Sequence, residues 1–594
     1  MNKKDTQKLE KWKSRLARAM VYLDNAAMDR REALYMGSHE VRGVKKAANV
    51  RNIVYELVES EVDNNVPPPR VQALHEEDRP LARQLEQLRW AQAQRLHLHA
   101  LNDRQERTVY IQGGDFLHVE WNPDAGFHCT MGDLEVSERH PRQVVPQPHV
   151  YDMEQMDYIF VLLSRTRKYL ESRYGVKIQS DSESEPQIRG ANAETSDDLV
   201  TQNIAYYRKN GVVGMFSWVD DQILADEPDY YGRKDEDGAV MLEEALLRDV
   251  TLSDGSVLPA VQSVSDSYVF NPDGSVQLDV TTGQPVLTAS VQQTMNPSYR
   301  PKSLPLVLRT NVSKPNSLLG VSDVDVIADQ QDAISKLGTK IQEKLLRGGS
   351  YVTMPDGVDV DTGNEELKII WLNNAAQKSL IDVINVQPNI SYDLQMLETN
   401  YSWAKSGLGI SDSFQGKYDP SALSGSAKQI AANQSASRLA SKREQKNQAY
   451  ARLYRMMFEF LLAYCDDEYP VVAQDADGEQ VWSHFDRYRF LKRDSAGELY
   501  WNDEFLFGVD ESATMSSNRE QLWNMATVMF QSGGFGPINT LEAAYRMWTF
   551  LDATDYPGAA ETKKSIRKQM DDEQVMQAQS GMDAPTGTIP EVMA

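Results

Sequence analysis

The sequence predicts an α+β protein in which helices predominate over smaller strand-rich parts. Apolar residues recur every three or four positions in several long segments, which is the spacing of amphipathic helices. Elsewhere short apolar runs alternate with polar residues or are separated by Asp-Gly pairs, which is typical of strands and hairpins. At roughly 150 residues per domain, the 594 residues have room for about four domains or for one elongated subunit of several parts.

The acidic balance of the chain limits the classes of function. The chain carries 62 Lys and Arg against 87 Asp and Glu, a net charge of -25. Tight wrapping around nucleic acid needs a cation for each neutralised phosphate, so this balance argues against it but leaves open a protein past which DNA slides. Only two cysteines occur, Cys129 and Cys465, which excludes a disulfide scaffold and suits a reducing compartment. The N-terminus has no signal-peptide core and no apolar run approaches the roughly 18 residues of a membrane helix, so we expect a soluble protein without membrane contact.

The first 51 residues are a basic exception, with 13 Lys and Arg against six Asp and Glu. Helical spacing places five apolar residues of this segment on one face: Leu9, Trp12, Leu16, Ala19 and Leu23. The segment therefore fits either an amphipathic helix docked on the body or a basic arm that touches DNA.

Residues 51–175 are expected to alternate between helix and strand. Helices are expected over residues 51–66, which stop before three prolines, and over about residues 78–101. Alternation at Leu117, Val119 and Trp121 predicts a strand within a β-rich stretch that reaches about residue 150. Residues 153–174 then return to helical spacing, with Met156, Phe160, Leu163 and Leu170 on one side and Gly175 at the end.

Residues 179–312 are expected to hold a loop followed by hairpins. The stretch 179–200 is acidic, rich in Ser and poor in apolar residues, which favours a loop. Between residues 201 and 312, three turn pairs separate short apolar runs: Asp237-Gly238, Asp254-Gly255 and Asp273-Gly274.

Residues 320–406 predict two helices around a small strand module. Ser322 with Asp325 three residues later resembles a capping box, and a stripe then runs up to Gly348 through Val324, Ile327, Gln331, Ile334, Leu337, Ile341 and Leu345. Strands are expected at residues 351–354 and 367–371. Pro388 opens a second helix of about residues 390–406, with Leu394, Leu397, Tyr401 and Ala404 on one face.

A Gly-rich segment and an unusually long helix follow. Residues 407–425 predict a long pliable loop. Residues 426–466 contain no Gly or Pro and predict one helix near 60 Å long. Its first half has small and polar side chains that bury too little apolar surface within one subunit, so we expect it to pack against other copies of the chain; a coiled-coil dimer is the alternative. The packing candidates are Ala427, Ala431, Ser435 and Arg438.

The serial order of these elements resembles that of tailed-bacteriophage portal proteins, the head-to-tail connectors, of the siphophage-like kind. Residues 320–337, GVSDVDVIADQQDAISKL, look like the first stem helix of this family. Residues 140–160, which contain HPRQVVPQP and MDYIF, look like its wing, and SALSGSAKQ at residues 421–429 looks like the opening of its long helix. The resemblance covers most of residues 40–470 and rests on the order of elements rather than on one motif.

The resemblance implies a portal-type subunit with several parts. These are an N-terminal basic helix and α/β wing (1–319), a stem helix (320–347), a clip (348–388), a second stem helix (389–406), a tunnel loop (407–425), a long wing helix with C-terminal wing strands (426–515), a helical crown (516–579) and a disordered tail (580–594). The crown has local support, because Ser517 and Glu520 form a capping box and Gly533-Gly534 would end the first helix. The strand-rich segment 201–312 is longer than expected of a wing.

By the same resemblance, copies of the chain form a ring, usually of twelve, at one capsid vertex, and duplex DNA passes through it without sequence specificity. Further implied partners are the major capsid and scaffold proteins, the terminase and the head–tail adaptor, with assembly in the cytoplasm of a bacterial host and a final place in the virion. Scattered cations on an acidic subunit fit a wall that holds DNA weakly, although each lysine fits an ordinary surface ion pair as well. The channel candidates are Lys336, Lys340, Lys344, Arg347, Gln415, Lys417 and Tyr418.

No sequence signature of an enzyme is found, so we expect no catalytic residue, cofactor or metal. The string that ends in Gly416-Lys417 lacks the first glycine and the Ser or Thr of a phosphate-binding loop. His128 and Cys129 are conceivable zinc ligands, but their spacing matches no known site, and the acidic run 466–468 fits a solvated helix end better than a cation site. The alternatives to a portal are another ring-forming head–tail or tail structural protein and, less favoured, a packaging ATPase or nuclease.

Overall fold

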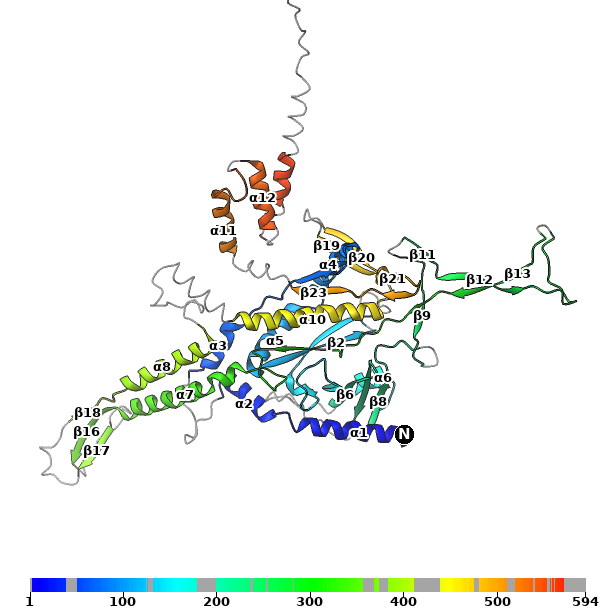
Figure 1. Ribbon diagram of the computed structural model, residues 1–594. Coiled ribbons are helices and arrows are strands. Elements are labelled where there is room, and N and C mark those ends of the chain that lie inside the picture. The colour runs from blue at the N-terminus through cyan, green and yellow to red at the C-terminus, as the bar shows by residue number, and fades with distance from the viewer. Residues whose placement is uncertain are drawn as a thin grey trace, which may run out of the picture.

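The protein is α+β, with a central body and three projections (Figure 1). The computed structural model describes residues 3–38, 51–123, 125, 132–178, 199–234, 239–252, 255–280, 283–355, 368–372, 383–410, 439–474, 480–509, 519–537, 540–552, 556, 558–559 and 561–570. Helices α7 and α8 project on one side of the body, the β12–β13 hairpin projects on the opposite side, and helices α11 and α12 lie above the body.

The centre of the body is an antiparallel sheet crossed by one long helix. The sheet has the order β15-β2-β3, formed by Leu306–Thr310, Gly114–Asn122 and Asp133–Arg139. Helix α10 (Ala440–Tyr464) packs against it through a fully buried apolar side that includes Leu453, Met457 and Phe460. The apolar second half of the expected long helix is thus confirmed, although it ends at Tyr464 rather than at residue 466. The first half, up to residue 438, lies outside the described residues.

A second sheet has five strands in the order β4-β5-β6-β7-β8. Its strands are Val144–Pro146, Tyr158–Thr166, Leu199–Lys209, Val212–Val219 and Gln222–Glu227. The helix expected over residues 153–174 is therefore wrong: β5 occupies its middle, and only α6 (Arg167–Tyr174) is helical. Ile159 and Val161 face the main core while Phe160 faces a separate core, so both sides of β5 are buried. Such a strand reads as a continuous apolar run, which has no period of two.

Helix α1 (Lys3–Met20) covers the outer face of this five-stranded sheet. Leu9, Trp12, Leu16 and Ala19 are buried against it, as the helical spacing predicted, and Leu23 packs at the edge of the same core. Two ion pairs add to the contact, Lys8 with Asp226 and Lys13 with Asp221. The docked amphipathic helix is thus confirmed. Helix α2 (Asn25–Tyr35) follows.

The helices between residues 51 and 113 are confirmed in part. Helix α3 (Ile53–Glu61) ends before the prolines as expected. The single helix expected over residues 78–101 is wrong, because α4 (Arg79–Arg95) and α5 (Leu98–Gln112) are separated by His97 in a left-handed conformation with φ 51°. No Gly or Pro marks this break in the sequence.

Strands pair across each of the three Asp-Gly sites, as predicted. Lys234 bridges to Val240, β10 (Val250–Thr251) pairs with β11 (Val257–Leu258), and Phe270 bridges to Val276. Strands β12 (Val261–Tyr268) and β13 (Leu287–Gln293) form the projecting hairpin, at the base of which β9 (Glu243–Ala245) pairs with β14 (Met295–Pro297). The loop expected over residues 179–200 lies outside the described residues up to residue 198.

The C-terminal part returns to the body and then forms a helical pair. Strand β1 pairs with β23, and β19–β20 and β21–β22 form two further antiparallel pairs, with bounds Pro69–Ala73, Phe505–Val509, Tyr469–Gln474, Gln480–Phe485, Leu491–Arg493 and Leu499–Trp501. Helices α11 (Arg519–Gln531) and α12 (Leu541–Asp552) match two expected crown helices, and residues 561–570 are helical. Residue 517 and the expected tail from residue 580 lie outside the described residues.

Candidate channel arm and its root

Two helices and a small sheet form the projecting arm. Helix α7 (Asp323–Arg347) runs outward and α8 (Ser391–Leu408) returns beside it (Figure 1). The tip between them holds a sheet of order β17-β16-β18, formed by Lys368–Leu372, Gly349–Pro355 and Val383–Val386. Strand β16 is parallel to β17 and antiparallel to β18. The expected order of helix, strand module and helix is confirmed.

The first turn of α7 is fixed by its cap. The Ser322 hydroxyl accepts a hydrogen bond from the Asp325 amide at 3.3 Å and donates one to the Ile111 carbonyl at 2.5 Å. Just before it, the Gly320 amide donates to the Gly113 carbonyl at 2.9 Å, and a Cβ atom on Gly113 would clash with the Gly320 carbonyl oxygen. The start of α7 is therefore tied to the end of α5 and cannot swing freely.

The predicted apolar stripe of α7 is buried near the body and exposed farther out. Val324, Ile327 and Ile334 belong to a core shared with α3 and α8, whereas Leu345 is largely exposed. On α8, Tyr401 and Ala404 face this core as expected and Leu397 packs at its edge. Leu394 was expected on the same face but is exposed.

Two of the predicted channel lysines form ion pairs across the arm. Lys340 Nζ lies 2.8 Å from Asp393 Oδ1 and Lys344 Nζ lies 2.5 Å from Asp393 Oδ2. These hydrogen bonds lower the pKa of the Asp393 carboxyl below its ordinary value. The lysines therefore hold α7 to α8, rather than pairing with acids four positions away on their own helix. Lys336 and Arg347 are exposed, and Arg347 is the last residue of α7.

The remaining predicted site residues lie outside the described part of the chain. They are the loop residues Gln415, Lys417 and Tyr418 and the packing residues Ala427, Ala431, Ser435 and Arg438. The cysteine and histidine considered as zinc ligands, Cys129 and His128, lie outside it as well.

Sequence reasoning missed a buried ionic cluster at the root of the arm, the place where α7 begins at Asp323 beside α3 and α10. Lys442 of α10 lies 2.5 Å from Glu61 Oε2 and 2.8 Å from Asp323 Oδ2. Burial opposes the charge on Lys442, but the two carboxylates outweigh it and raise its pKa. Burial together with Asp323 raises the pKa of Glu61 to about 8.

A second ionic group continues this cluster along α10. Lys446 Nζ lies 2.7 Å from Glu106 Oε1, and Arg309 donates to the same oxygen at 2.8 Å. Arg309 and Glu106 are both almost completely buried. Because an unpaired buried charge is costly, each of them stabilises the charge of the other. The two lysines of α10 stand four residues apart and lead into the buried side of the helix at Ala449 and Leu453. Two lysines on the same side of a helix as its apolar residues are the one sequence signal that could have indicated buried acidic partners.

The outer side of the arm carries large apolar side chains. Tyr392, Met396 and Trp403 are spaced by four and seven residues and so share one face of α8. Tyr392 is 81% exposed and Trp403 is 55% exposed. Two helices can cover one another on one side only, so this face meets solvent in the single chain. Exposed apolar stripes of this kind are typical of protein–protein contact surfaces.

The acidic run 466–468 follows the end of α10, with Asp467 and Glu468 exposed as expected of a solvated helix end. Asp466 accepts hydrogen bonds from Arg233 at 2.7 Å and pairs with Arg487 at 2.6 Å, and Glu468 pairs with Arg248. These ion pairs explain the acids without a cation. Among the described residues, no group of three or more His, Cys, Asp or Glu lies close enough to hold a metal ion.

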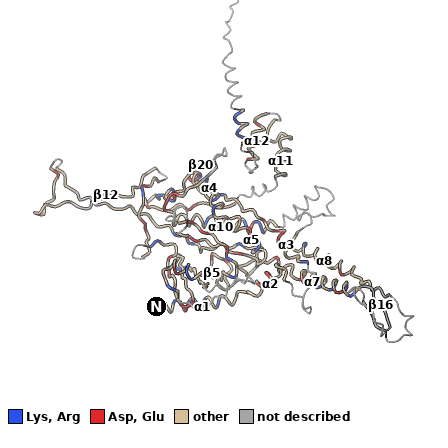
Figure 2. Tube along the Cα trace, turned by 180° about the vertical axis from the view of Figure 1, so that it is seen from behind, with Lys and Arg blue, Asp and Glu red and all other residues tan. Residues whose placement is uncertain are grey.

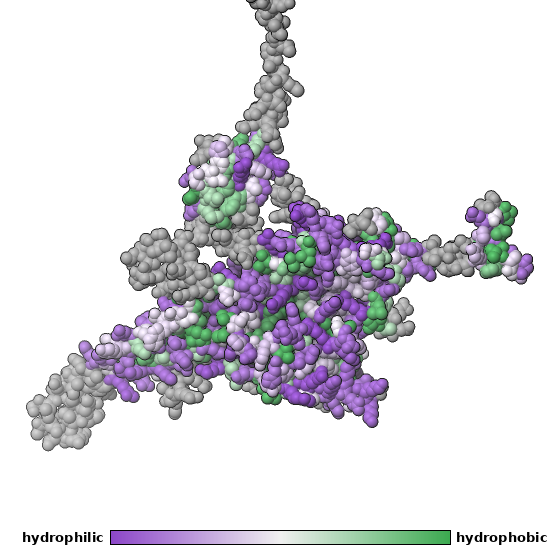
Figure 3. Space-filling view, viewed as in Figure 1, coloured by the Kyte–Doolittle hydropathy of each residue, from purple (hydrophilic) through white to green (hydrophobic). Residues whose placement is uncertain are grey.

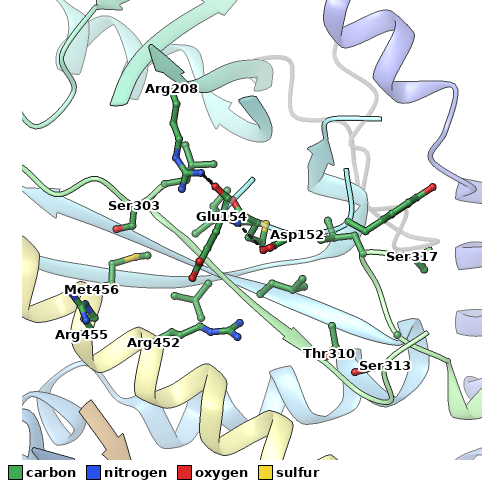
Figure 4. Close-up of a pocket in the computed structure, with 18 of the residues that line it drawn as sticks. Asp152, Glu154, Arg208, Ser303, Thr310, Ser313, Ser317, Arg452, Arg455 and Met456 are labelled. Atoms are coloured by element: carbon green, nitrogen blue, oxygen red, sulfur yellow. Dashed lines mark hydrogen bonds between the residues drawn. The ribbon is translucent and has the colours of Figure 1, made fainter. Parts of the chain in front are cut away.

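A cavity of about 450 Å³ lies beside α10 and is lined in part by Arg208, Arg452 and Arg455 (Figure 4). Arg208 donates to the main-chain oxygens of Glu154 and Met156, and Arg455 pairs with Glu459 at 3.1 Å. The Arg208 bonds join two segments of the body and the Arg455 pair lies within α10, so both groups have structural partners and the cavity gives no indication of chemistry.

No protein-family model matches the chain, and no curated protein matches it either. None of the helices in the described part has the length and apolar character that crossing a membrane would require.

Proposed function

We propose that this chain is a portal subunit of a tailed bacteriophage: a structural protein without catalytic activity, copies of which form a ring that conducts double-stranded DNA. The observation that carries the proposal is the arm, in which two packed helices end in a small sheet and expose an apolar face outward. The proposal draws on the order of elements in the sequence, which resembles that of portal proteins.

The exposed face of α8 supports self-association. Trp403 and Tyr392 lie on the side of α8 that faces away from α7 and are exposed in the described part of the chain. If arms stand side by side around an axis, each arm buries this face against its neighbour. Such a contact joins two different surfaces, and contacts of that kind form a closed ring when the rotation between copies closes.

The charge of the arm suits a passage that holds DNA weakly. Helix α7 has five Asp and Glu against four Lys and Arg, and α8 has two against one. Two of the lysines are already paired with Asp393. Few cations remain to displace the counterions of DNA. Because counterion release drives non-specific binding to DNA, the arm should bind a duplex weakly and let it move.

The other parts would then serve as docking surfaces. The sheet at the tip of the arm would contact the terminase during packaging and the head–tail adaptor afterwards, and the body would face the major capsid and scaffold proteins. This assignment places the protein at one vertex of the virion, usually with twelve copies.

The test is the mass and shape of the purified full-length protein. We expect native mass spectrometry to give a closed oligomer, with twelve times the chain mass of 67.1 kDa as the leading possibility. Negative-stain images should show a turbine-shaped ring with a central hole and a stalk. Monomers at high concentration, filaments or discs without a stalk would contradict the proposal.

A further inference from the structure

The β12–β13 hairpin, residues 261–293, projects from the body with little to support it. Strands β12 and β13 pair only with each other among the described residues, so each has an edge without a neighbouring strand. Figure 1 shows the hairpin reaching away from the body on the side opposite to the α7–α8 arm. An isolated two-stranded hairpin is marginally stable in water, and open strand edges are templates for another chain.

Several apolar side chains in the described part of the hairpin are exposed to solvent. Phe270, Leu278 and Val280 near the tip are exposed, and Val280 is completely so. Val261 and Val291 are exposed near its base. Figure 3 shows the hydrophobic residues gathered at the far end of the hairpin. These exposed apolar side chains indicate that the hairpin contacts a partner outside the single chain.

The charge of the hairpin has one sign only. No Lys, Arg or His occurs between Arg248 and Arg300, whereas Asp266, Asp273 and Asp279 lie on the hairpin. Its partner surface should therefore be basic and partly apolar. Nucleic acid is excluded as the partner because its phosphates carry the same charge.

Helix α1 offers such a surface on every copy of the chain. Basic residues recur along it at spacings of three and four and so share one face, forming a basic stripe of Lys4, Lys8, Lys11, Arg15 and Arg18. Figure 2 colours the Lys and Arg positions along the backbone. Within the stripe Lys8 is paired with Asp226 and Arg15 stacks on Trp12, but Lys4, Lys11 and Arg18 are exposed. Directly after the helix, Val21 is 81% exposed and Tyr22 is 62% exposed.

We infer that the hairpin of one copy lies on α1 of a second copy, with its acids against the basic stripe and its apolar tip against Val21 and Tyr22. The inference rests on the self-association proposed above. A second copy is the partner that the structure supports, because it supplies the complementary charge and the exposed apolar residues together. The hairpin would thus tie neighbouring copies together at a distance from the contacts between the α7–α8 arms.

The first experiment reverses the charges on each side and then on both. Asp273→Lys with Asp279→Lys alters the hairpin, and Lys4→Glu with Lys11→Glu and Arg18→Glu alters α1. A control, Asp467→Lys with Glu498→Lys, makes the same charge change as the hairpin variant at two exposed acids elsewhere in the body. We expect each one-sided variant to raise the concentration needed for assembly about tenfold, the combination of both sides to restore it, and the control to have no effect.

The second experiment locates the contact directly. Equal amounts of ¹⁴N- and ¹⁵N-labelled full-length protein are mixed, reassembled and treated with a zero-length cross-linker that joins carboxylates to lysines. We expect mixed-isotope links between Asp273 or Asp279 and Lys3, Lys4 or Lys11. Links within one isotope alone, or none at these residues, would overturn the inference.

The two proposals fail in different ways. A ring that assembles equally well with every charge variant and yields no such link would refute the hairpin contact and leave the portal proposal standing. A chain that remains monomeric at all concentrations would refute both. Assembly that is lost in one-sided variants and is not restored by combining them would also refute the pairing of these two surfaces.

Discussion

Lys442 Nζ lies 2.8 Å from Oδ2 of Asp323, so the helix that crosses the body is bonded to the first residue of the outward-running helix of the arm. The same ammonium group contacts Glu61 of α3. Three helices from distant parts of the sequence therefore meet at one buried charge. The start of the arm is thus joined to α10 by this ion pair and to the end of α5 by the hydrogen bonds before α7.

Removal of this charge should loosen the root of the arm. Lys442→Met leaves the buried carboxyl groups of Glu61 and Asp323 without their cation, and breaking a buried pair costs ~3–5 kcal/mol. We expect faster amide hydrogen exchange in the first turns of α7 and in α3. The control is Lys3→Met, which removes an exposed lysine of α1 and should leave these amides unchanged. Unaltered protection in Lys442→Met would show that the ion pairs do not hold the root.

The exposed face of α8 should be needed for assembly but not for folding. Tyr392→Glu with Trp403→Glu places two charges on a face that is open in the single chain, so the fold should persist. We expect the oligomer to dissociate in native mass spectra while circular dichroism stays the same, because a charge inside a contact between copies is costly to bury.

The matched control for this prediction is Trp90→Glu, at a tryptophan on α4 that is 51% exposed. This variant should assemble normally. Assembly of the Tyr392 and Trp403 double variant as well would exclude α8 from the contact between copies.

The sequence predicted the arm well because each of its signals is local. Helical spacing, the Ser322 cap and the interruption at Gly348 all lie within a few residues of what they determine. Strand β5 was mistaken for a helix, because residues buried on both sides of a sheet lose the alternation by which strands are recognised. The turn at His97 was missed because no Gly or Pro in the sequence indicates that this histidine adopts a left-handed conformation.

The root of the arm could not be predicted by such signals. Lys442 is 381 residues from Glu61 and 119 residues from Asp323 along the sequence. The three side chains come together only when the body has folded. The pairing of Lys340 and Lys344 with one aspartate on the returning helix also depends on how two helices pack. Spacing predicted that these lysines lie on α7 and left open whether they face DNA or another helix.

The buried His118 should make the body sensitive to mild acid. Burial lowers its pKa to about 4 despite nearby Glu120, and its Nε2 lies 3.0 Å from the Tyr206 hydroxyl. Arg139 and Arg165 oppose its protonation as well. Above an ordinary pKa of 6.5 the histidine is neutral in both states, so it has no effect on the pH dependence there.

Between pH 6.5 and 4 the unfolded chain takes up a proton at His118 that the folded chain does not. The free energy of unfolding should fall over this range by at most ~3 kcal/mol from this residue. We expect His118→Gln, which keeps a partner for Tyr206, to reduce the pH dependence of the free energy of unfolding. The measurement is urea unfolding at a series of pH values from 7 to 4. The control is His99→Gln, which makes the same substitution at an exposed histidine of α5. Equal slopes in wild type and His118→Gln would refute the assignment.

The two ion pairs at Asp393 should stiffen the outer half of the arm. Asp393→Asn removes the charge shared by Lys340 and Lys344, so α7 and α8 should separate more readily near the tip. We expect faster hydrogen exchange at the amides of residues 391–397 and 337–345, with assembly retained. Glu398→Gln, at an exposed acid on the same helix, is the control.

The pH dependence supplies a second test of the same contact. Because the folded pKa of Asp393 lies below its ordinary value of 3.8, the contribution of these ion pairs is complete above that value and is lost as the pH falls through the folded pKa. Protection of the outer arm should therefore fall at low pH in the wild type more than in Asp393→Asn. If both proteins lose protection in parallel, the lysines at this position are free to serve another role, and contact with passing DNA becomes the role to test first.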